Sequence, residues 1–257
     1  MTDDPLSPQP GSAPPEPQPV ALHLPSFPPT VTYAIIGVTV FIFALQMGTK
    51  TLLGMDIPAM IGIKDNELIR AGQLWRLFTP MLLHDNGGLL HIGFNMYFLF
   101  IVGRQVEQLY GHERYLVLYV LSGFTGAVLS FLFSPYRAWG ASGALFGLLG
   151  SQAVLAVQNR ALFRDGGKSL LSNALSIAGI NILLGFFINA DNWGHVGGLV
   201  GGAMFAWFAG PRLAITGAYP NLLTLTDQRG LRETVNAAAL VLLVFGGMAA
   251  AGIFLLP

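Results

Sequence analysis

The 257-residue sequence contains no cysteine, which excludes disulfides, thiol catalysis and iron–sulfur clusters. Charge is scarce as well, because Asp, Glu, Lys and Arg make up only 10% of the residues, against about 25% in a typical soluble domain. The formal net charge is zero, so no basic surplus points to nucleic acid as a partner. Lys and Arg are missing before Lys50, and the first apolar run follows a polar, proline-rich stretch, so we expect no secretory signal peptide.

Apolar residues are abundant instead. They make up 53% of the chain, and the mean hydropathy is +0.59, which predicts an all-α, polytopic membrane protein. Long apolar runs predict seven membrane-spanning helices, at residues 31–47, 89–106, 115–133, 143–157, 170–188, 193–209 and 235–256. The long connection between the first two runs mixes aromatic, cationic and aliphatic residues, so we expect it to lie partly in the bilayer surface.

The placement of Lys and Arg predicts how the chain crosses the membrane. With a cytoplasmic N-terminus, eight cations lie inside, namely Arg104, Arg114, Arg160, Arg164, Lys168, Arg212, Arg229 and Arg232. Five lie outside, namely Lys50, Lys64, Arg70, Arg76 and Arg137. Because cytoplasmic loops carry the excess of cations, this sum favours a cytoplasmic N-terminus, although the first span alone has its cations on the other side. A prokaryotic cell membrane is the expected location.

Polar residues lie near the starts of three predicted spans. The second span carries His91 and Asn95, which are four residues apart and therefore share one helical face. The fourth begins with Ser142 between glycines, and the sixth carries His195. These even-numbered spans all cross in the same direction, so their starts lie at the same membrane face. Because polar groups in hydrocarbon are costly, their gathering at one level indicates a functional site.

Glycine spacing predicts which helices touch. The sixth span has glycines four apart, at Gly194, Gly198 and Gly202, and the fourth has Gly143 and Gly147. Such spacing allows close backbone approach between membrane helices, so we expect the fourth and sixth spans to pack tightly. That contact would bring His195 toward Ser142. A purely structural glycine zipper is the alternative, and the two interpretations are compatible.

The residue types suggest roles for these side chains. Ser142 is the candidate nucleophile, and His195 is the candidate base that removes its proton. His91 and Asn95, together with the backbone N–H of Ser142, are the candidate donors to an oxyanion. A helix start adds unpaired N–H groups and the positive end of a dipole. The pattern predicts serine hydrolase chemistry.

Two further possibilities concern neighbouring residues. Asp191 precedes His195 by four residues and could complete a triad, but a helix N-cap is the favoured interpretation. His84, His91 and His195 could supply three metal ligands, yet no pair of glutamates and no His-x-x-Glu-His pattern accompanies them. We therefore expect neither a metal nor a cofactor.

Taken together, these motifs resemble the rhomboid family of intramembrane serine proteases over about residues 75–202. In chain order, the shared features are Trp75-Arg76, His91-x-x-x-Asn95, Gly103-x-x-x-Glu107-x-x-x-Gly111, Gly140-x-Ser142-Gly143 and His195-x-x-Gly198-x-x-x-Gly202. Each motif alone has little specificity, but their order and spacing are specific as a set. One departure is Phe146, because many members have Tyr there; a phenyl ring can still stack on the histidine.

The resemblance implies a six-helix core at residues 31–212, with a water-filled cavity open to the outside. The proline-rich, apolar-poor composition of residues 1–30 predicts a disordered tail before this core. The resemblance extends to the polar linker and additional C-terminal transmembrane helix at 213–257, as in the six-plus-one arrangement of part of the family. It also implies a Ser142–His195 dyad without an acidic member, oxyanion donors at His91 and Asn95, and a first loop ordered by Trp75-Arg76. The fifth helix and the loop after it would gate substrate entry.

Single-pass transmembrane proteins in the lipid bilayer are the implied substrates, cut near the outer face. One alternative is a catalytically inactive rhomboid-like protein that binds or escorts membrane proteins; the presence of both Ser142 and His195 argues against it. A channel or transporter is a second alternative. The sequence has no visible internal repeat, and its polar residues gather at one side, which both count against a transporter.

Overall fold

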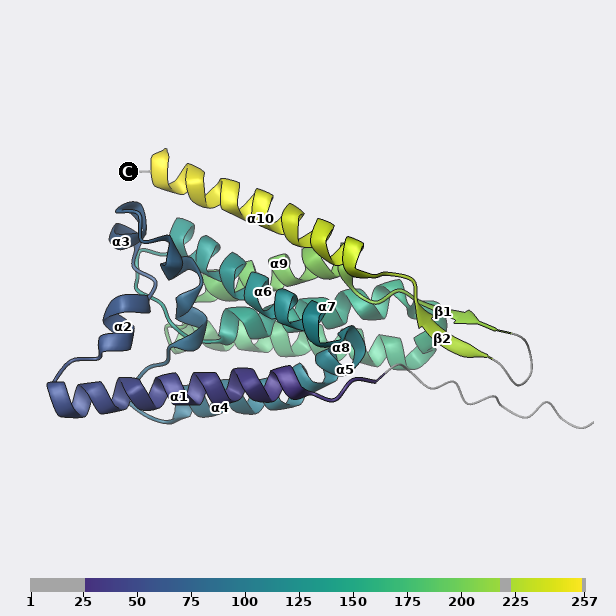
Figure 1. Ribbon diagram of the computed structural model, residues 1–257, viewed down its shortest axis with the longest axis horizontal. Helices are drawn as coiled ribbons and strands as arrows, with labels where there is room; N and C mark the ends of the chain where they lie inside the picture. Colours follow the sequence, from purple (N-terminus) through teal and green to yellow (C-terminus); the bar gives the residue numbers. More distant parts are fainter. Residues whose placement is uncertain (1–25, 218–222, 256–257) are drawn as a thin grey trace, which may run out of the picture.

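The computed structural model describes residues 26–217 and 223–255, and these are mainly helical (Figure 1). The long helices are α1 (Thr30–Leu53), α6 (His112–Phe133), α7 (Ser142–Gln158), α8 (Arg160–Phe187), α9 (Asn192–Ala209) and α10 (Leu231–Phe254). Another long helical stretch is made of α4 (Leu90–Phe98), the π-helical segment η3 (Leu99–Gly103) and α5 (Arg104–Tyr110). The loop after α1 holds short helices, α2 (Ile57–Gly62), α3 (Asn66–Arg70), η1 (Leu74–Leu77) and η2 (Thr79–Leu82).

Several of these helices are long and apolar enough to cross a membrane. Within the described residues, α1, α6, α10 and the part of α8 at Asp165–Phe187 meet both conditions. The predicted spans at 89–106, 143–157 and 193–209 correspond to α4–η3–α5, α7 and α9, which are not among these four. A polytopic membrane protein is confirmed, while the count of six helices plus one stays a prediction.

The linker at 210–234 corrects the all-α expectation. It contains a hairpin of β1 (Leu213–Thr216) and β2 (Thr224–Asp227), which pair antiparallel with Leu213 opposite Asp227. Threonine, which suits strands, occupies three of the eight positions, and the Thr216 and Thr224 hydroxyls lie 3.2 Å apart across the pair. A second correction concerns the connection predicted at 158–169, most of which is the first part of α8.

The end of the predicted tail is also ordered. Phe27 donates its backbone N–H to the carbonyl of Gln108 at 3.2 Å, and its ring meets the His112 ring edge-on at 5.9 Å. The predicted disorder at 1–30 is therefore wrong for Ser26 to Thr30, and the rest of that segment, residues 1–25, lies outside the described residues.

Local sequence signals explain where several helices begin and end. Asp56 caps α2 by accepting from the N–H of Ala59, and Asp65 caps α3 by accepting from two N–H groups. α1 ends at Gly54, whose φ of 71° is the left-handed conformation that glycine adopts without strain. These caps satisfy backbone groups that the short helices and the end of α1 would otherwise leave unpaired.

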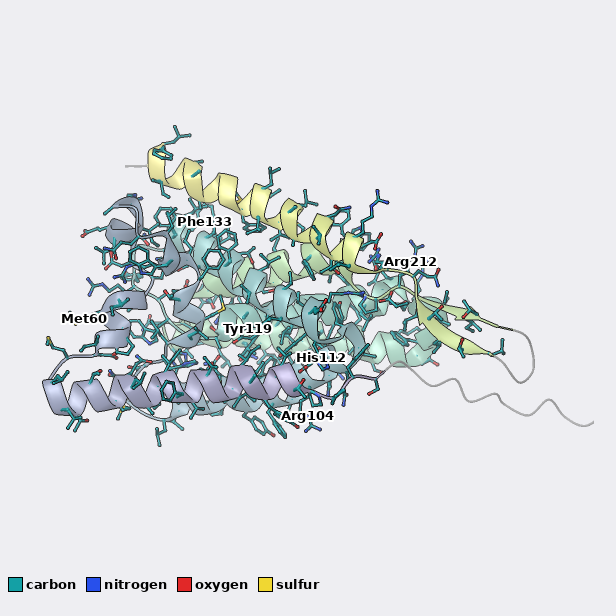
Figure 2. The ribbon with its side chains drawn as sticks, viewed as in Figure 1. Met60, Arg104, His112, Tyr119, Phe133 and Arg212 are labelled. Atoms are coloured by element: carbon teal, nitrogen blue, oxygen red, sulfur yellow. The ribbon has the colours of Figure 1, made fainter. Side chains whose placement is uncertain are left out.

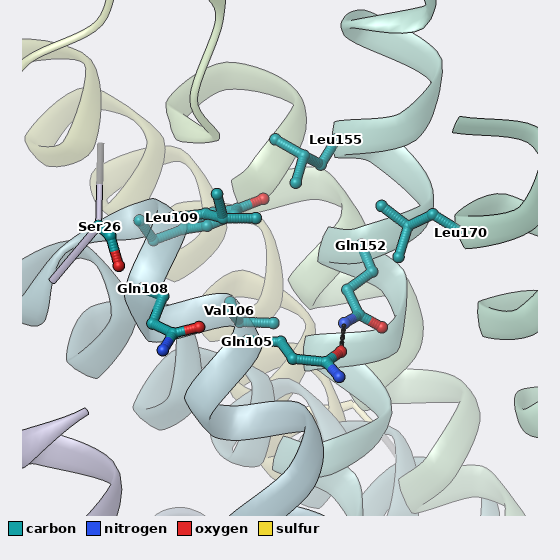
Figure 3. A pocket seen from close by; sticks show the side chains of 9 residues that line it. Ser26, Gln105, Val106, Gln108, Leu109, Gln152, Leu155 and Leu170 are labelled. Carbon is teal, nitrogen blue, oxygen red and sulfur yellow. Dashed lines mark hydrogen bonds between the residues drawn. The ribbon is translucent and has the colours of Figure 1, made fainter. Parts of the chain in front are cut away.

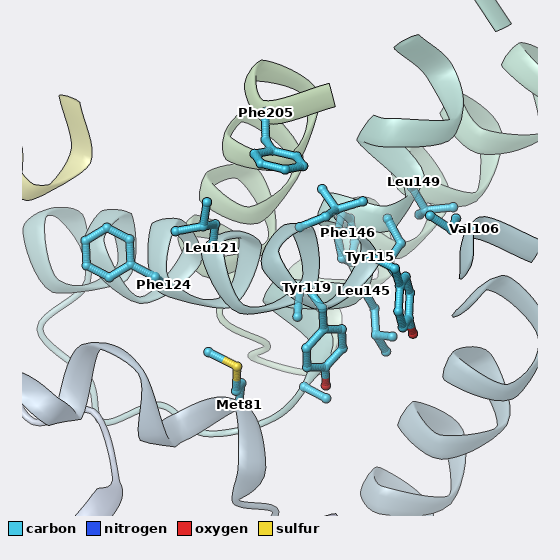
Figure 4. Close-up of a cluster of buried hydrophobic side chains, with 14 of the residues drawn as sticks. Met81, Val106, Tyr115, Tyr119, Leu121, Phe124, Leu145, Phe146, Leu149 and Phe205 are labelled. Carbon is cyan, nitrogen blue, oxygen red and sulfur yellow. The ribbon is translucent and has the colours of Figure 1, made fainter. Parts of the chain in front are cut away.

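The centre of the molecule is formed by α6, α7 and α9, which pack against each other more closely than any other helices. Buried side chains from α6 and α7 fill the space around them, joined by Met81 from η2 and Phe205 from α9 (Figure 4). The glycines predicted to touch do so: a Cβ at Gly198 would overlap the backbone of Gly143, and one at Gly202 would overlap Gly147. The close contact predicted between the fourth and sixth spans is therefore confirmed.

The start of α1 is held by a carboxylate from α5. Glu107 is fully buried, and it accepts from the backbone N–H groups of Val31 and Thr32 at 2.8 and 2.7 Å and from the Thr32 hydroxyl at 2.6 Å. His112 Nδ1 lies 2.7 Å from the same carboxylate. Glu107 thus satisfies N–H groups that no helical carbonyl can reach.

The two ends of the bundle differ in what they carry. The hairpin and the start of α1 lie at one end, and α2, α3 and the end of α10 lie at the other (Figure 1). Arg212 marks the hairpin end, and Met60 lies on the opposite side of the molecule (Figure 2). We refer to these as the hairpin end and the loop end.

Candidate active site

Ser142 is the first residue of α7 and is half-buried at the loop end. The chain reaches it through Gly140, whose φ of 128° lies in a region that favours glycine. The N–H of Gly140 donates to the carbonyl of Pro80 in η2 at 2.9 Å, which fixes this turn to the first loop. The hydroxyl therefore lies at a helix N-terminus, where backbone N–H groups are unpaired.

His195 comes to this hydroxyl from the first turn of α9. Its Nε2 lies 3.0 Å from Ser142 Oγ, and its ring stacks on Phe146 with centroids 4.2 Å apart and planes 6° from parallel. The expectation that Phe146 can stack on the histidine is confirmed. His195 Nδ1 is buried, and no hydrogen-bond partner for it exists among the described residues.

Asp191 is the N-cap of α9. Its side chain accepts from the backbone N–H of Gly194 at 3.1 Å, as the favoured interpretation predicts. The backbone N–H of His195 donates to the carbonyl of Asp191 at 3.0 Å, but among the described residues the Asp191 carboxylate makes no hydrogen bond to the His195 imidazole. The geometry therefore gives no support to a triad through this residue.

His91 also lies beside the Ser142 turn. Its Nε2 is 3.0 Å from the position that a Cβ on Gly140 would take, and Ser142 Oγ is 3.8 Å from the same point. Asn95 lies one turn further along α4, is buried, and donates to the carbonyl of His91 at 2.8 Å. The structure thus brings Ser142, His195 and His91 together, and it bonds Asn95 to its own helix.

A small cavity of about 40 Å³ adjoins this cluster, enough for roughly two or three water molecules. Ser142 and Asp191 line it, and so does the side of Lys64 from the first loop. A larger cavity of about 330 Å³ lies between α5, α7 and α8, where Gln105 and Gln152 bond each other at 3.1 Å (Figure 3). It is about three turns along α7 from Ser142, and none of the predicted site residues lines it.

Comparison with known proteins identifies the family to which this region belongs. Residues 71–212, more than half of the chain, match the model of the rhomboid domain. The chain belongs to the rhomboid family. The match begins after α1 and ends before the hairpin, and it includes every predicted site residue of this rhomboid.

Curated relatives cover a similar stretch of this rhomboid. The chain is 41% identical over 175 residues to rhomboid protease GluP of Bacillus subtilis (strain 168), which is 68% of this chain and 34% of that protein. It is 30% identical over 181 residues to RHOMBOID-like protein 9, chloroplastic, and 36% over 156 residues to RHOMBOID-like protein 5, both of Arabidopsis thaliana. These two matches cover 70% and 59% of the chain, and 41% and 50% of the relatives, so the chain spans half or less of the proteins it matches.

The first loop of this rhomboid is ordered by Trp75 and Arg76. The Trp75 indole donates to the carbonyl of Ile61 at 3.0 Å, and the Arg76 guanidinium donates to the carbonyls of Met60 and Ile63. The ordering role implied by the resemblance therefore has a structural basis.

Lys64 also lies near the site, although the sequence predicts no role for it there. Its ammonium is buried and donates to the carbonyls of Ser134 and Tyr136 at 2.8 and 2.7 Å, and its backbone pairs with Ala138. Burial lowers the pKa of Lys64 to about 8. Lys64 thus ties the first loop to the segment that leads into Ser142. An isolated lysine in a loop carries no sequence signal for such a tie.

His84, considered above only as a possible metal ligand, packs beside His91 and the turn before Ser142. It is buried, its ring lies 5.1 Å from the His91 ring, and its Nε2 is 3.5 Å from the backbone N of Ala141. Within the part of the chain that the structure describes, no group of three or more His, Cys, Asp or Glu could hold a metal ion. His84 therefore belongs to the packing around the serine.

Proposed function

We propose that this rhomboid is an intramembrane serine endopeptidase that cleaves single-pass transmembrane proteins near the outer membrane face. One observation carries the proposal: Ser142 Oγ and His195 Nε2 are 3.0 Å apart at the start of a helix. A nucleophile and a base within hydrogen-bond reach form the minimal unit of serine hydrolase chemistry. Membership of the rhomboid family supports the same reading.

In the proposed reaction, His195 Nε2 takes the proton of Ser142 as Oγ attacks the carbonyl carbon of the scissile peptide bond. The protonated His195 then gives that proton to the leaving nitrogen, which releases the amine and leaves an ester on Ser142. A water molecule attacks the ester, its proton passing to His195, and the acid is released as Ser142 regains a proton. The small cavity beside Ser142 is the proposed source of that water.

The charge that develops on the carbonyl oxygen needs hydrogen-bond donors. The backbone N–H of Ser142 and the His91 imidazole are the donors that the geometry favours, because both lie at the Gly140 turn. Asn95 is the third predicted donor, and its side-chain bond to His91 keeps it close. The stacking of Phe146 supports His195 as the base, since it fixes the plane of the imidazole.

A substrate helix has to unwind before its peptide bond reaches Ser142, because a helical carbonyl is already hydrogen-bonded. In hydrocarbon each unpaired backbone group costs several kcal/mol, so substrates with Gly or Pro near the cut should be preferred. The proposed orientation has a cytoplasmic N-terminus, which places the loop end outside.

The test is cleavage of a generic single-pass reporter by the purified protein in detergent. Ser142→Ala and His195→Ala should each abolish cleavage, and the double variant should be no worse, because residues that act as a unit are non-additive. Ser176→Ala, at an exposed serine of α8, is the matched control and should cleave like the wild type. Substantial cleavage by folded Ser142→Ala would overturn the proposal. Capture of the reporter without any cleavage by the wild type would instead favour the inactive, escort-like alternative.

A further inference from the structure

Gln46 lies in α1, outside the segment that matches the rhomboid domain, and its side chain is almost fully buried. Its side-chain amide forms two hydrogen bonds with the backbone of His84 in the first loop. Nε2 donates to the carbonyl of His84 at 3.0 Å, and Oε1 accepts from the N–H of His84 at 3.0 Å. Nε2 also donates to Asp56 Oδ2 at 2.9 Å. Every one of these contacts reaches out of α1 to the loop that precedes α4.

Asp85, the residue after His84, contacts the candidate active site. The backbone N–H of Asp85 donates to Nδ1 of His91 at 3.4 Å. A backbone N–H can only donate, so His91 Nδ1 must accept. A neutral imidazole that accepts at Nδ1 carries its hydrogen on Nε2. His91 Nε2 is the atom that faces Gly140 and Ser142, as described above.

His84 adds a second link from the same backbone. Its ring packs edge-on against the His91 ring, and its Nε2 lies 3.5 Å from the N of Ala141, directly before Ser142. Fixing the backbone at His84 therefore fixes the ring that supports His91 on one side and the Ser142 turn on the other.

We propose that Gln46 is a positioning residue that holds the His84–Asp85 backbone so that His91 presents Nε2–H to the oxyanion formed at Ser142. The inference rests on the proposed protease function, since the oxyanion is an intermediate of that reaction. A glutamine amide suits this place, because the His84 carbonyl needs a donor and the His84 N–H needs an acceptor. Leucine supplies neither, and glutamate supplies the acceptor but brings a second carboxylate toward Asp56.

The primary test reads the imidazole itself and needs no activity. Histidine-labelled protein in detergent is studied by ¹⁵N NMR, and the His91 signal is assigned by its loss in His91→Gln. The wild type should show the Nε2–H form, and Gln46→Leu should show a mixture with the Nδ1–H form. Gln46→Glu keeps the acceptor for the His84 N–H, so it should show a smaller shift and serves if Gln46→Leu fails to fold. Gln105→Leu, at an exposed glutamine of α5, is the matched control and should leave the signal unchanged.

Reporter cleavage provides the second reading. Gln46→Leu should lower kcat by about ten- to a hundredfold with little change in KM, because an oxyanion donor acts in the transition state and its complete loss costs about 10²–10³ in kcat. The double variant Gln46→Leu/His91→Ala should lose no more kcat than His91→Ala alone. An unchanged Nε2–H signal in folded Gln46→Leu, or additive losses in the double variant, would overturn the proposal. If the wild type cleaves nothing, the protease function fails, while the NMR outcome still decides whether Gln46 sets the His91 tautomer.

Discussion

The contact between α7 and α9 leaves no room for one additional carbon at Gly198, so Gly198→Ala should damage the site without touching either reacting residue. A Cβ built there lies 2.6 Å from the backbone carbon of Gly143, whereas packed carbon atoms prefer separations of about 3.5–4.0 Å. Neither helix has a side chain at the contact that could turn away. The helices must therefore separate by about 1 Å.

That separation acts directly on the reacting pair, because Gly143 follows Ser142 and Gly198 lies one turn after His195. The distance from Ser142 Oγ to His195 Nε2 should grow from 3.0 Å toward about 4 Å, which is beyond hydrogen-bond range. A misplacement of about 1 Å can cost about 100-fold in rate, so we expect kcat for reporter cleavage to fall by about that factor. Overpacking should also cost about 1–3 kcal/mol of stability.

The matched control is Gly179→Ala in α8, where a built Cβ meets no atom within 4 Å. This variant should keep wild-type kcat. Both proteins are assayed for reporter cleavage and for labelling of Ser142 by a fluorophosphonate, and circular dichroism verifies that each is folded. A folded Gly198→Ala protein with wild-type kcat would refute the reasoning, and so would an equal loss in Gly179→Ala.

Two further predictions concern residues beside the site. Asp191→Asn should keep most reporter cleavage, because asparagine also caps helices; a loss of about 10⁴ in kcat with normal folding would instead indicate a triad. For Lys64, the pKa of about 8 in the folded protein lies below the value of 10.5 for an unburied lysine, so the unfolded chain binds more protons between these values. The free energy of unfolding should therefore rise from pH 8 to pH 10 in the wild type relative to Lys64→Met. Thermal melts in detergent measure this difference, and identical pH slopes in the two proteins would contradict the lowered pKa of Lys64.

Much of the candidate site could be predicted because its signals are local. The four-residue spacing of His91 and Asn95 fixes one helical face, and glycines four apart mark helices that approach closely. Helix direction then places the starts of alternate spans together. From these rules alone, Ser142 and His195 were expected to meet, and they lie 3.0 Å apart.

The parts that could not be predicted depend on long-range contacts. Gln46 and His84 are 38 residues apart, and Lys64 bonds carbonyl groups about 70 residues later. Backbone acceptors have no signature in a sequence, so a side chain that binds them looks like any other polar residue. The packing of α6 is a further example: its hydrophobic run predicts a span, but only the structure shows that Gly197 of α9 packs on the backbone of Thr125.

The bond between Glu107 and the start of α1 has a consequence for how the protein is made. The chain grows from its N-terminus, and Thr32 precedes Glu107 by 75 residues. At about 5–20 residues per second, this interval lasts roughly 4–15 seconds. During that time the N–H groups of Val31 and Thr32 have to bind water, because leaving them unpaired in hydrocarbon costs several kcal/mol. The start of α1 therefore depends on water as its acceptor until α5 has been made and Glu107 can take the place of that water.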